Sequence, residues 1–266
     1  MICWTVVNQK GGVGKTTTAV TLAGWLVRDG YRVLLVDLDP QASLTGYLMR
    51  ETAESGQGVF DLFMPEPDVA LRPVRRTAID GMDLIAGSPA LATLDRKLSG
   101  QPGQGLVLAR YLQNVARHYD FALIDCPPTL GVLMINAIAA ADRLLMPVQT
   151  EHLALKGLER MLRTLSMVQR TRKSAVDYLI IPSMYDRRTR ASIDSLAALN
   201  REHGAKLWGE VIPVDTRFRE ASERGQPIPQ LFPESRGARA YRVLLDELLD
   251  ELLDPQGLPQ REEISA

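Results

Sequence analysis

Cysteine is scarce in this sequence of 266 residues, which contains only Cys3 and Cys126. Each lies in or directly after an apolar run of buried type, so a small secreted fold stapled by disulfides is excluded and a reducing cytosol is favoured. Long apolar runs are missing too, and the first residues lack the basic and apolar regions of a secretion signal. The sequence therefore predicts a cytoplasmic protein without membrane insertion.

Histidine is also rare, and the net charge is small. The three histidines, His118, His152 and His203, stand at unrelated spacings, so no zinc site is indicated. A formal net charge of −1 gives no overall basic surface, and any contact with nucleic acid must come from a local patch. With 45% hydrophobic and 24% charged residues, the chain has the composition of a globular protein large enough for one α/β domain.

The most informative stretch runs from Asn8 to Thr17 and follows the apolar run from Ile2 to Val7. A β-branched and aromatic run that stops at a glycine-rich turn and resumes as a helix predicts strand, loop and helix. The glycines let backbone N–H groups approach an anion, and the helix adds its positive end. Lys15 would neutralise phosphate oxygens and the Thr16 hydroxyl would hold Mg²⁺. The predicted phosphate-binding residues are Lys10, Gly11, Gly12, Val13, Gly14, Lys15, Thr16 and Thr17.

One position departs from the strict phosphate-loop pattern, which has glycine five residues before Gly14, where this chain has Gln9. In place of the usual start stands a second lysine, Lys10. The segment Lys-Gly-Gly-Val-Gly-Lys-Thr resembles the deviant phosphate loop of the ParA/MinD family of ATPases. The resemblance implies ATP as the ligand, and it implies that Lys10 reaches across a dimer interface to the nucleotide of the other subunit. A glycine-rich surface turn is the alternative.

Two further segments place acids after buried runs. The strand predicted at Val33 to Val36 ends in Asp37-Leu38-Asp39, and the strand at 121–125 ends in Asp125. Carboxylates at the carboxyl edge of a parallel sheet lie where such sheets bind ligands, and there they can hold Mg²⁺ or orient the attacking water. By resemblance to the family, Asp39 supports hydrolysis and the metal, and Asp125 is a second metal holder. Asp37 is either a supporting site for metal-bound water or a cap or turn acid.

Cys126 directly follows Asp125, and the nitrogenase iron protein, which shares this loop architecture, holds an iron–sulfur cluster between subunits. That cluster needs two cysteines from each chain, and Cys3 offers no matching second ligand. We therefore expect Cys126 to be a packed small residue.

Later segments resemble the parts of ParA proteins that approach the nucleotide base and DNA. Met184 follows the strand predicted at 177–182, and Pro213 follows a later apolar pair; the family counterparts of both lie beside the base. The segment at 214–228 corresponds to one that supplies arginines to DNA phosphates. The interleaved Asp215, Glu220 and Glu223 would also fit an ordinary mixed surface. The candidate DNA contacts are Arg190, Arg217, Arg219 and Arg224.

Alternating apolar runs and helical stripes predict an α/β fold, a three-layer sandwich with a mostly parallel twisted central sheet of the phosphate-loop type. Strands are predicted at 2–7, 33–36, 82–86, 121–125, 142–148 and 177–182, and helices at 16–29, 59–63, 88–98, 152–172, 191–203 and 235–253. We expect a single ATPase domain over 1–253 and an acidic, disordered tail over 254–266. Residues 43–105 are the least informative part. Acids in the last helix argue against membrane docking.

The resemblance runs from Met1 to about Leu253, with no helix-turn-helix domain before the loop, as in short ParA proteins. Segments such as 213–217 and 235–237 are similar to ParC-type proteins encoded with chemotaxis clusters. This implies a slow ATPase switch that forms an ATP-bound homodimer, responds to a partner protein or cargo adaptor, and positions the polar chemoreceptor array. One alternative is a plasmid or chromosome partition ATPase on non-specific, nucleoid DNA with a centromere-binding partner. Another is a metabolic ATP-dependent synthetase.

Overall fold

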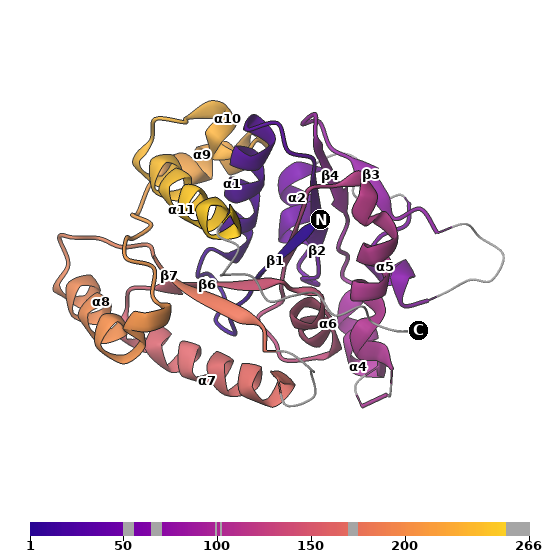
Figure 1. Ribbon diagram of the computed structural model, residues 1–266, viewed down its shortest axis with the longest axis horizontal. Helices are drawn as coiled ribbons and strands as arrows, with labels where there is room; N and C mark the ends of the chain where they lie inside the picture. Colours follow the sequence, from indigo (N-terminus) through magenta and orange to yellow (C-terminus); the bar gives the residue numbers. More distant parts are fainter. Residues whose placement is uncertain (50–55, 65–70, 99, 102, 170–174, 254–266) are drawn as a thin grey trace.

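A β-sheet runs through the middle of the molecule, and helices cover both of its faces (Figure 1). The computed structural model describes residues 1–49, 56–64, 71–98, 100–101, 103–169 and 175–253, and within them the sheet has seven strands. The strand order is β3-β4-β2-β5-β1-β6-β7, and every neighbouring pair is parallel except β3 with β4. The strands are β1 (Ile2–Val6), β2 (Val33–Asp37), β3 (Val74–Arg76), β4 (Met82–Ile85), β5 (Phe121–Asp125), β6 (Arg143–Gln149) and β7 (Asp177–Ser183).

The helices form two layers. One layer, with α1, α2, α9, α10 and α11, lies on one face of the sheet, and α3 to α8 contribute to the other. This arrangement confirms the predicted α/β sandwich with a mostly parallel sheet. The helices are α1 (Lys15–Arg28), α2 (Ser43–Leu48), α3 (Val59–Leu62), α4 (Leu91–Leu98), α5 (Val107–Val115), α6 (Val132–Ala140), α7 (His152–Gln169), α8 (Arg190–His203), α9 (Arg217–Glu223), α10 (Ile228–Leu231) and α11 (Arg236–Leu253).

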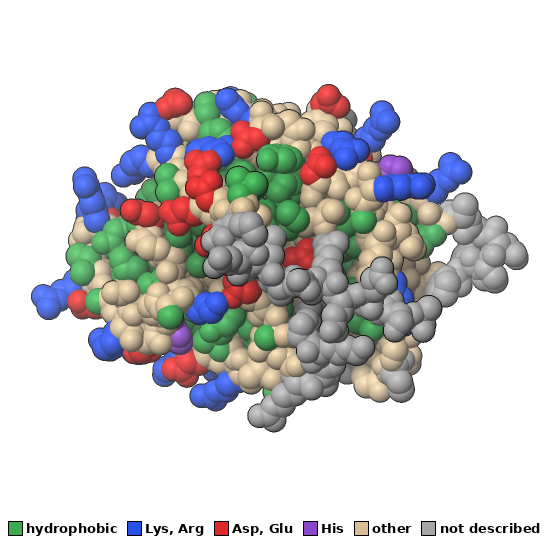
Figure 2. All heavy atoms as spheres, viewed as in Figure 1, with side chains coloured by type: hydrophobic (Ala, Val, Ile, Leu, Met, Phe, Trp, Pro, Cys, Tyr) green, Lys and Arg blue, Asp and Glu red, His purple; other side chains and the backbone are tan. Residues whose placement is uncertain are grey.

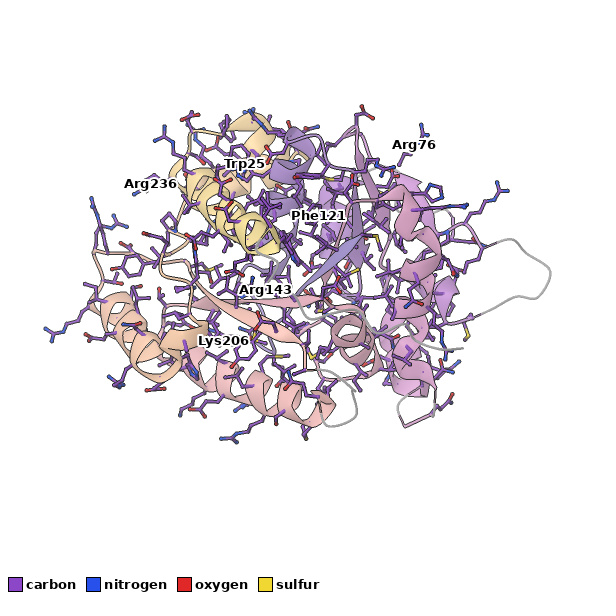
Figure 3. The ribbon with its side chains drawn as sticks, in the orientation of Figure 1. Trp25, Arg76, Phe121, Arg143, Lys206 and Arg236 are labelled. Carbon is purple, nitrogen blue, oxygen red and sulfur yellow. The ribbon has the colours of Figure 1, made fainter. Side chains whose placement is uncertain are left out.

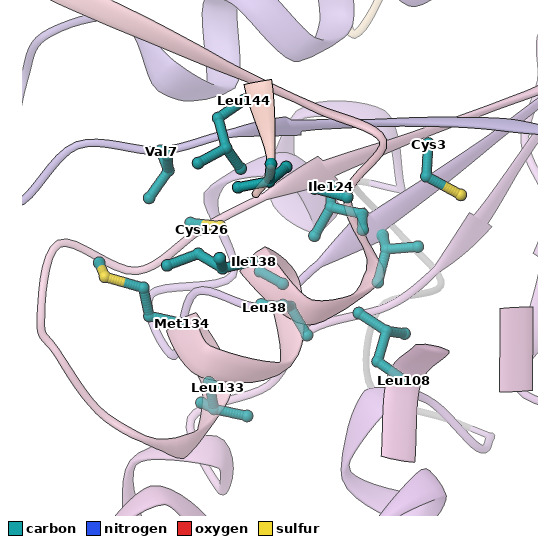
Figure 4. Close-up of a cluster of buried hydrophobic side chains, with 14 of the residues drawn as sticks. Cys3, Val7, Leu38, Leu108, Ile124, Cys126, Leu133, Met134, Ile138 and Leu144 are labelled. Atoms are coloured by element: carbon teal, nitrogen blue, oxygen red, sulfur yellow. The ribbon is translucent and has the colours of Figure 1, made fainter. Parts of the chain in front are cut away.

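The strands divide their side chains between two hydrophobic cores, because successive residues of a strand point to opposite faces. In β2, Leu34 and Val36 pack into the core beneath α6 and α7, whereas Leu35 packs into the core beneath α1 and α11. Figure 4 shows part of the first core around α6. It includes Cys126, which is fully buried as a free thiol, so the prediction of a packed small residue is confirmed. Cys3 is also buried and free.

The structure contains elements that the sequence pattern did not reveal, namely α2, β3, α5, α6, α9 and α10. Helix α6 is apolar on nearly all sides, so it has no polar face to produce a helical stripe. Its N-cap residue, Gly131, has no side chain to accept a hydrogen bond. Asp95 of α4 replaces it, because its Oδ1 accepts the Leu133 N–H at 3.0 Å. A contact between helices therefore defines the start of α6.

The boundaries of the predicted elements hold within a few residues. The last part of the helix predicted at 152–172 lies outside the described residues, since α7 ends at Gln169. The predicted acidic tail at 254–266 lies outside them as well. Among the helices that the structure describes, none combines the length and the hydropathy that a bilayer-spanning segment requires.

Helix α11 closes the second core against α1. The buried Tyr241 hydroxyl lies 2.7 Å from Thr18 Oγ1, and the Trp25 indole N–H donates to the Ala238 carbonyl at 3.0 Å. Burial raises the pKa of Tyr241 above its ordinary value. Both contacts position the last helix on the helix that follows the glycine-rich loop.

We expect Tyr241→Phe to lower the free energy of unfolding by about 1 kcal/mol, because the variant loses one buried hydrogen bond and keeps the ring. Urea denaturation followed by circular dichroism measures the change. Tyr31→Phe is the matched control, because Tyr31 is partly exposed at 37%. Equal losses in the two variants would contradict a specific role for the bond to Thr18.

Candidate nucleotide and magnesium site

The glycine-rich loop lies at the carboxyl edge of the sheet, between the end of β1 and the start of α1. Gly12 and Gly14 have φ angles of 75° and 95°, in the left-handed region that favours glycine. The Val13 side chain is fully buried, and its carbonyl accepts a hydrogen bond from Ser183 Oγ at 3.0 Å. Gly14 caps α1 without a side-chain hydrogen bond, so the positive end of this long helix is available to an anion.

The two lysines of the loop have different surroundings. Lys15, at the start of α1, is only 7% exposed, and its Nζ lies 3.4 Å from the Lys10 carbonyl oxygen. The Lys10 ammonium instead forms an ion pair with Glu151 and lies 3.3 Å from Gln149 Oε1. Lys10 therefore binds the connection between β6 and α7 of its own chain. Glu151 and Gln149 were not among the predicted site residues.

The predicted acids come together beside the loop. Asp37 and Asp125 end the adjacent parallel strands β2 and β5 in direct register, and both are buried. Thr16 Oγ1, in the first turn of α1, donates a hydrogen bond to Asp125 Oδ2 at 2.5 Å. Asp39 is 8% exposed and close enough for its charge to act on both acids. Three predicted metal residues, Thr16, Asp39 and Asp125, therefore share one site.

Burial and mutual repulsion shift the titration of these acids. Burial, and then the charge of Asp37, raise the pKa of Asp125 to about 8, against the opposing effects of the Thr16 hydrogen bond and the Lys15 charge. Burial raises the pKa of Asp37 to about 6, although hydrogen bonds from Thr45 and Asp39 oppose the shift. At neutral pH Asp125 therefore tends to keep its proton, whereas Asp37 is mostly ionised.

The residues present fit a magnesium ion. Asp125 Oδ1 is buried and has no hydrogen-bond partner among the described residues. Carboxylate and hydroxyl oxygens are ligands that Mg²⁺ prefers, and the ion usually takes one or two carboxylates together with substrate phosphates and water. No cluster of three or more His, Cys, Asp or Glu side chains in the described residues is placed to hold a metal without help. Here such an ion would bind together with a nucleotide, whose phosphates would supply further oxygen ligands.

Asp37 makes the contacts of a turn and cap acid. Its Oδ2 accepts hydrogen bonds from the backbone N–H and hydroxyl of Thr45, and its Oδ1 accepts the Asp39 N–H at 3.1 Å. The structure thus contains the cap geometry, while the register with Asp125 keeps Asp37 beside the candidate metal site. Thr45 was missed from the sequence, because the contact forms only when α2 folds back over the end of β2.

The segments predicted to approach the base lie side by side. The Tyr185 N–H donates to the Ile212 carbonyl at 3.0 Å, and the Val214 N–H donates to the Tyr185 carbonyl at 3.1 Å. Met184 and Pro213 are therefore neighbours at the end of β7, as expected. Met184 has a φ of 53°, which is rare for a residue with a side chain. Its Cε would lie 3.9 Å from a Cβ placed on Gly14, so this segment overhangs the loop.

The four candidate DNA residues are exposed, but acids accompany most of them. Arg190 pairs with Asp194, and Arg217 pairs with Glu220 at 2.5 Å. Arg217 and Arg224 also lie over the Phe232 ring, at 4.6 and 5.6 Å from its centroid. Arg219 has no ion pair among the described residues.

The face of the molecule in Figure 2 is mixed in charge, with Lys and Arg side chains next to acids. Arg236 projects into solvent at the start of α11 (Figure 3). Its charge helps to lower the pKa of Asp186, although the hydrogen bond from Arg188 has the larger effect. The connection between β7 and α8 and the start of α11 therefore lie close enough for their charges to interact.

Comparisons with known proteins show which proteins this chain is similar to. A family model described as an AAA domain matches residues 1–182. The chain is 39% identical over 246 residues to the sporulation initiation inhibitor protein Soj of Bacillus subtilis, covering 91% of this chain and 96% of that protein. It is 34% identical over 254 residues to the chromosome partitioning protein ParA of Caulobacter vibrioides, covering 94% and 95%.

Two solved structures also resemble this chain over nearly its whole length. Cobyrinic acid a,c-diamide synthase from Mycobacterium smegmatis, with a bound ATP analogue and magnesium, matches with a TM-score of 0.81 and 32% identity, covering 98% of this chain and 100% of that one. Apo McdA from Cyanothece matches with a TM-score of 0.82 and 25% identity, covering 94% and 99%.

The raised pKa values predict how stability depends on pH in the absence of nucleotide and metal. In the folded protein Asp125 keeps a proton at pH values where the unfolded chain has lost it, so unfolding releases a proton. The free energy of unfolding should therefore fall as pH rises from about 4 to about 8, with a slope of roughly 1 kcal/mol per pH unit for one such group. Asp125→Asn should reduce the slope and be more stable than the parent at pH 8.

Urea denaturation at several pH values, in buffer with a metal chelator, measures this dependence. Asp80→Asn, which removes an exposed acid, is the control and should keep the slope of the parent. A slope that is the same in Asp125→Asn and in the parent would show that Asp125 ionises normally in the folded chain.

Proposed function

This chain belongs to the ParA/MinD-type AAA-domain ATPases, and from this premise we propose that it positions or segregates an intracellular cargo through an ATP-controlled homodimer. Membership of the family makes it an ATPase with ATP and Mg²⁺ as cofactors and a role in positioning or segregation. The observation that carries the dimer proposal is the second lysine of the loop, which binds Glu151 and not its own phosphate-binding turn.

In this proposal each residue of the site has a separate task. The backbone of Gly11 to Gly14 and the Lys15 ammonium bind the triphosphate. Thr16 and Asp125 hold the magnesium ion, which neutralises phosphate charge when it is bound. Asp39 assists hydrolysis by orienting the attacking water, and the neighbouring segments of Met184 and Pro213 contact the base.

Lys10 supplies the link between nucleotide and dimer. Its ammonium and the Glu151 carboxylate are both partly exposed, and such pairs are worth only about 0–1 kcal/mol. A triphosphate on a second subunit offers more negative charge than one carboxylate. We expect Lys10 to leave Glu151 for the partner's nucleotide when two subunits meet, so that the γ-phosphate acts as the latch. Hydrolysis, slow until a partner protein stimulates it, then opens the dimer.

Lys10→Ala should keep nucleotide binding and lose ATP-dependent dimerisation, because the loop amides and Lys15 remain but the charge given to the other subunit is gone. Asp39→Ala should do the opposite and give a long-lived ATP dimer, because hydrolysis is blocked. Size-exclusion chromatography with light scattering, with and without ATP and Mg²⁺, measures both outcomes.

Lys156→Ala, which removes an exposed lysine from α7, is the control for Lys10→Ala and should dimerise like the parent. Fluorescent ATP analogues confirm that each variant still binds nucleotide. Dimerisation of Lys10→Ala to the same extent as the parent would rule out the role of Lys10 in the other subunit.

We propose the polar chemoreceptor array as the favoured cargo. The support is the resemblance of segments 213–217 and 235–237 to ParC-type proteins. These segments form one surface, because Asp215 Oδ2 accepts the Gly237 N–H at 2.9 Å. A Cβ on Gly237 would lie 2.5 Å from the Phe218 ring, so the close contact requires glycine at that position. A cargo adaptor that binds here would contact α9 and the start of α11 together.

A second candidate function is partition of a plasmid or chromosome on non-specific DNA, together with a centromere-binding partner. The exposed Arg219 favours it, because no acid among the described residues neutralises its charge. A third candidate, a metabolic synthetase, shares the loop but requires a small-molecule acceptor and continuous ATP use. Rapid ATP turnover with no macromolecular partner would favour the third.

If the DNA function is correct, the double variant Arg217→Glu and Arg219→Glu should lose ATP-dependent retention on random duplex DNA. The parent should bind in a salt-sensitive way, and the slope of log affinity against log salt should fall by about 2 when two phosphate contacts are removed. Fluorescence anisotropy at several salt concentrations measures this. Arg110→Glu on α5 is the control for charge. Equal DNA retention by the double variant and the parent would contradict this DNA surface.

A further inference from the structure

Thr45 is a buried residue of α2 without a part in the chemistry proposed above, yet it contacts an acid of the nucleotide site. Its side chain is 1% exposed. Its hydroxyl and its backbone N–H both donate to Asp37 Oδ2, at 2.7 and 2.8 Å. The Gly87 N–H, in the connection after β4, donates to Thr45 Oγ1 at 2.8 Å. One threonine thus joins the end of β2, helix α2 and the connection after β4.

The direction of these hydrogen bonds is fixed by chemistry. A backbone N–H can only donate, so Thr45 Oγ1 is the acceptor for Gly87, and the single hydroxyl proton is left for Asp37. Serine can make the same two bonds, whereas valine, which has nearly the same shape, can make neither. The hydroxyl therefore has a fixed rotation and acts on one oxygen of the carboxylate.

The two oxygens of Asp37 are used unequally. Oδ2 receives both hydrogen bonds from Thr45, whereas among the described residues Oδ1 receives only the Asp39 N–H, at 3.1 Å. A carboxylate oxygen can accept two hydrogen bonds, so Oδ1 keeps acceptor capacity for a water molecule or another donor. Because Asp37 is in register with Asp125, that capacity is available beside the proposed magnesium site.

The connection after β4 is shaped to keep this arrangement. A Cβ on Gly87 would lie 2.8 Å from Asp37 Cγ and 2.8 Å from the Asp37 carbonyl oxygen, closer than real Cβ atoms approach such neighbours. Glycine is therefore required for the Gly87 N–H to reach Thr45. The backbone of the connection therefore packs against the carboxylate that Thr45 holds.

Helix α2 also depends on the same carboxylate. Its N-cap residue, Ala42, has a φ of 51° and offers no side-chain hydrogen bond. The Thr45 N–H, which an N-cap side chain would otherwise accept, is taken by Asp37 instead. At the other side of the helix, the Tyr47 hydroxyl donates to the Gln226 carbonyl at 3.0 Å. The start of α2 is therefore held by an acid of the nucleotide site.

We propose that Thr45 is a positioning residue for magnesium-dependent nucleotide binding, which holds the Asp37 carboxylate through Oδ2 and leaves Oδ1 for the magnesium site of Thr16 and Asp125. The inference rests on that proposed site. Without the hydroxyl, only the backbone N–H groups of Thr45 and Asp39 hold the Asp37 carboxylate, so it is positioned less firmly and more Mg²⁺ is needed to bring it into place. Thr45 itself touches neither the nucleotide nor the metal.

The test compares Thr45→Val, Thr45→Ser and the parent as full chains. The measured quantity is the Mg²⁺ concentration that gives half-maximal binding of a fluorescent ATP analogue, and the Mg²⁺ dependence of ATP hydrolysis is measured beside it. We expect Thr45→Val to need about tenfold more Mg²⁺, as for the loss of one hydrogen bond to a charged group. Thr45→Ser should stay within about twofold of the parent, because it keeps the hydroxyl.

Thr5→Val is the matched control. Thr5 is fully buried in β1, and its hydroxyl donates to the Ala137 carbonyl at 3.0 Å, so the variant loses a buried hydrogen bond away from the acids. It should be less stable than the parent but bind with the same Mg²⁺ requirement. An unchanged requirement in Thr45→Val, or an equal rise in Thr5→Val, overturns the positioning role.

Two more variants complete the test. If Thr45→Val does not fold, Gly87→Ala disturbs the same carboxylate through the Cβ that it adds and should raise the Mg²⁺ requirement; an unchanged value overturns the proposal. Asp125→Asn tests the magnesium site itself. If it abolishes Mg²⁺ dependence while Thr45→Val changes nothing, only the positioning role is overturned. If Asp125→Asn keeps the Mg²⁺ dependence of the parent, the magnesium site and the inference fail together.

Discussion

Two acids buried side by side impose the main constraint on this protein. Asp37 and Asp125 end adjacent parallel strands in register, and almost no water reaches either of them. Buried like charges are costly unless cations or hydrogen-bond donors compensate them. The chain supplies Lys15, Thr16 and Thr45 for this purpose, but one oxygen of Asp125 has no partner among the described residues. A magnesium ion that arrives with ATP would complete the compensation, which gives the nucleotide control over this edge of the sheet.

The strand order then separates the roles of the two loop lysines. Because β1 lies between β5 and β6, the glycine-rich loop has different neighbours on its two sides. On the β5 side, Lys15 and Thr16 act on the buried Asp125. On the β6 side, Lys10 meets Glu151 at the start of the connection to α7. In the proposed function, Lys15 of this loop would bind the nucleotide of its own subunit, and Lys10 would remain available for the nucleotide of a second subunit.

Features that depend on one continuous stretch of chain could be predicted from the sequence. Contacts between segments that are far apart along the chain could not. The loop, the acids after the buried runs and the strands that carry them could be predicted, because each depends on a continuous stretch of chain. Thr45 and Gly87 could not, since their contact forms only because β4 and β2 are neighbours despite their separation along the chain. Glu151 was missed for a similar reason, since its ion pair with Lys10 joins two segments that are far apart along the chain. Helix α6 gave no stripe because it is apolar on nearly all sides.

The weak ion pair of Lys10 and Glu151 suits a residue that, in the proposed function, changes partners when ATP binds. Both side chains are partly in water, so screening leaves the pair only a small advantage over separated charges. A buried pair would lock Lys10 to its own chain, because breaking it would leave an uncompensated charge. A fully free lysine would lose more side-chain entropy on meeting a second subunit. In the proposed dimer, this intermediate case would keep Lys10 ordered near the interface, and the charge of a γ-phosphate would then be enough to draw it from Glu151.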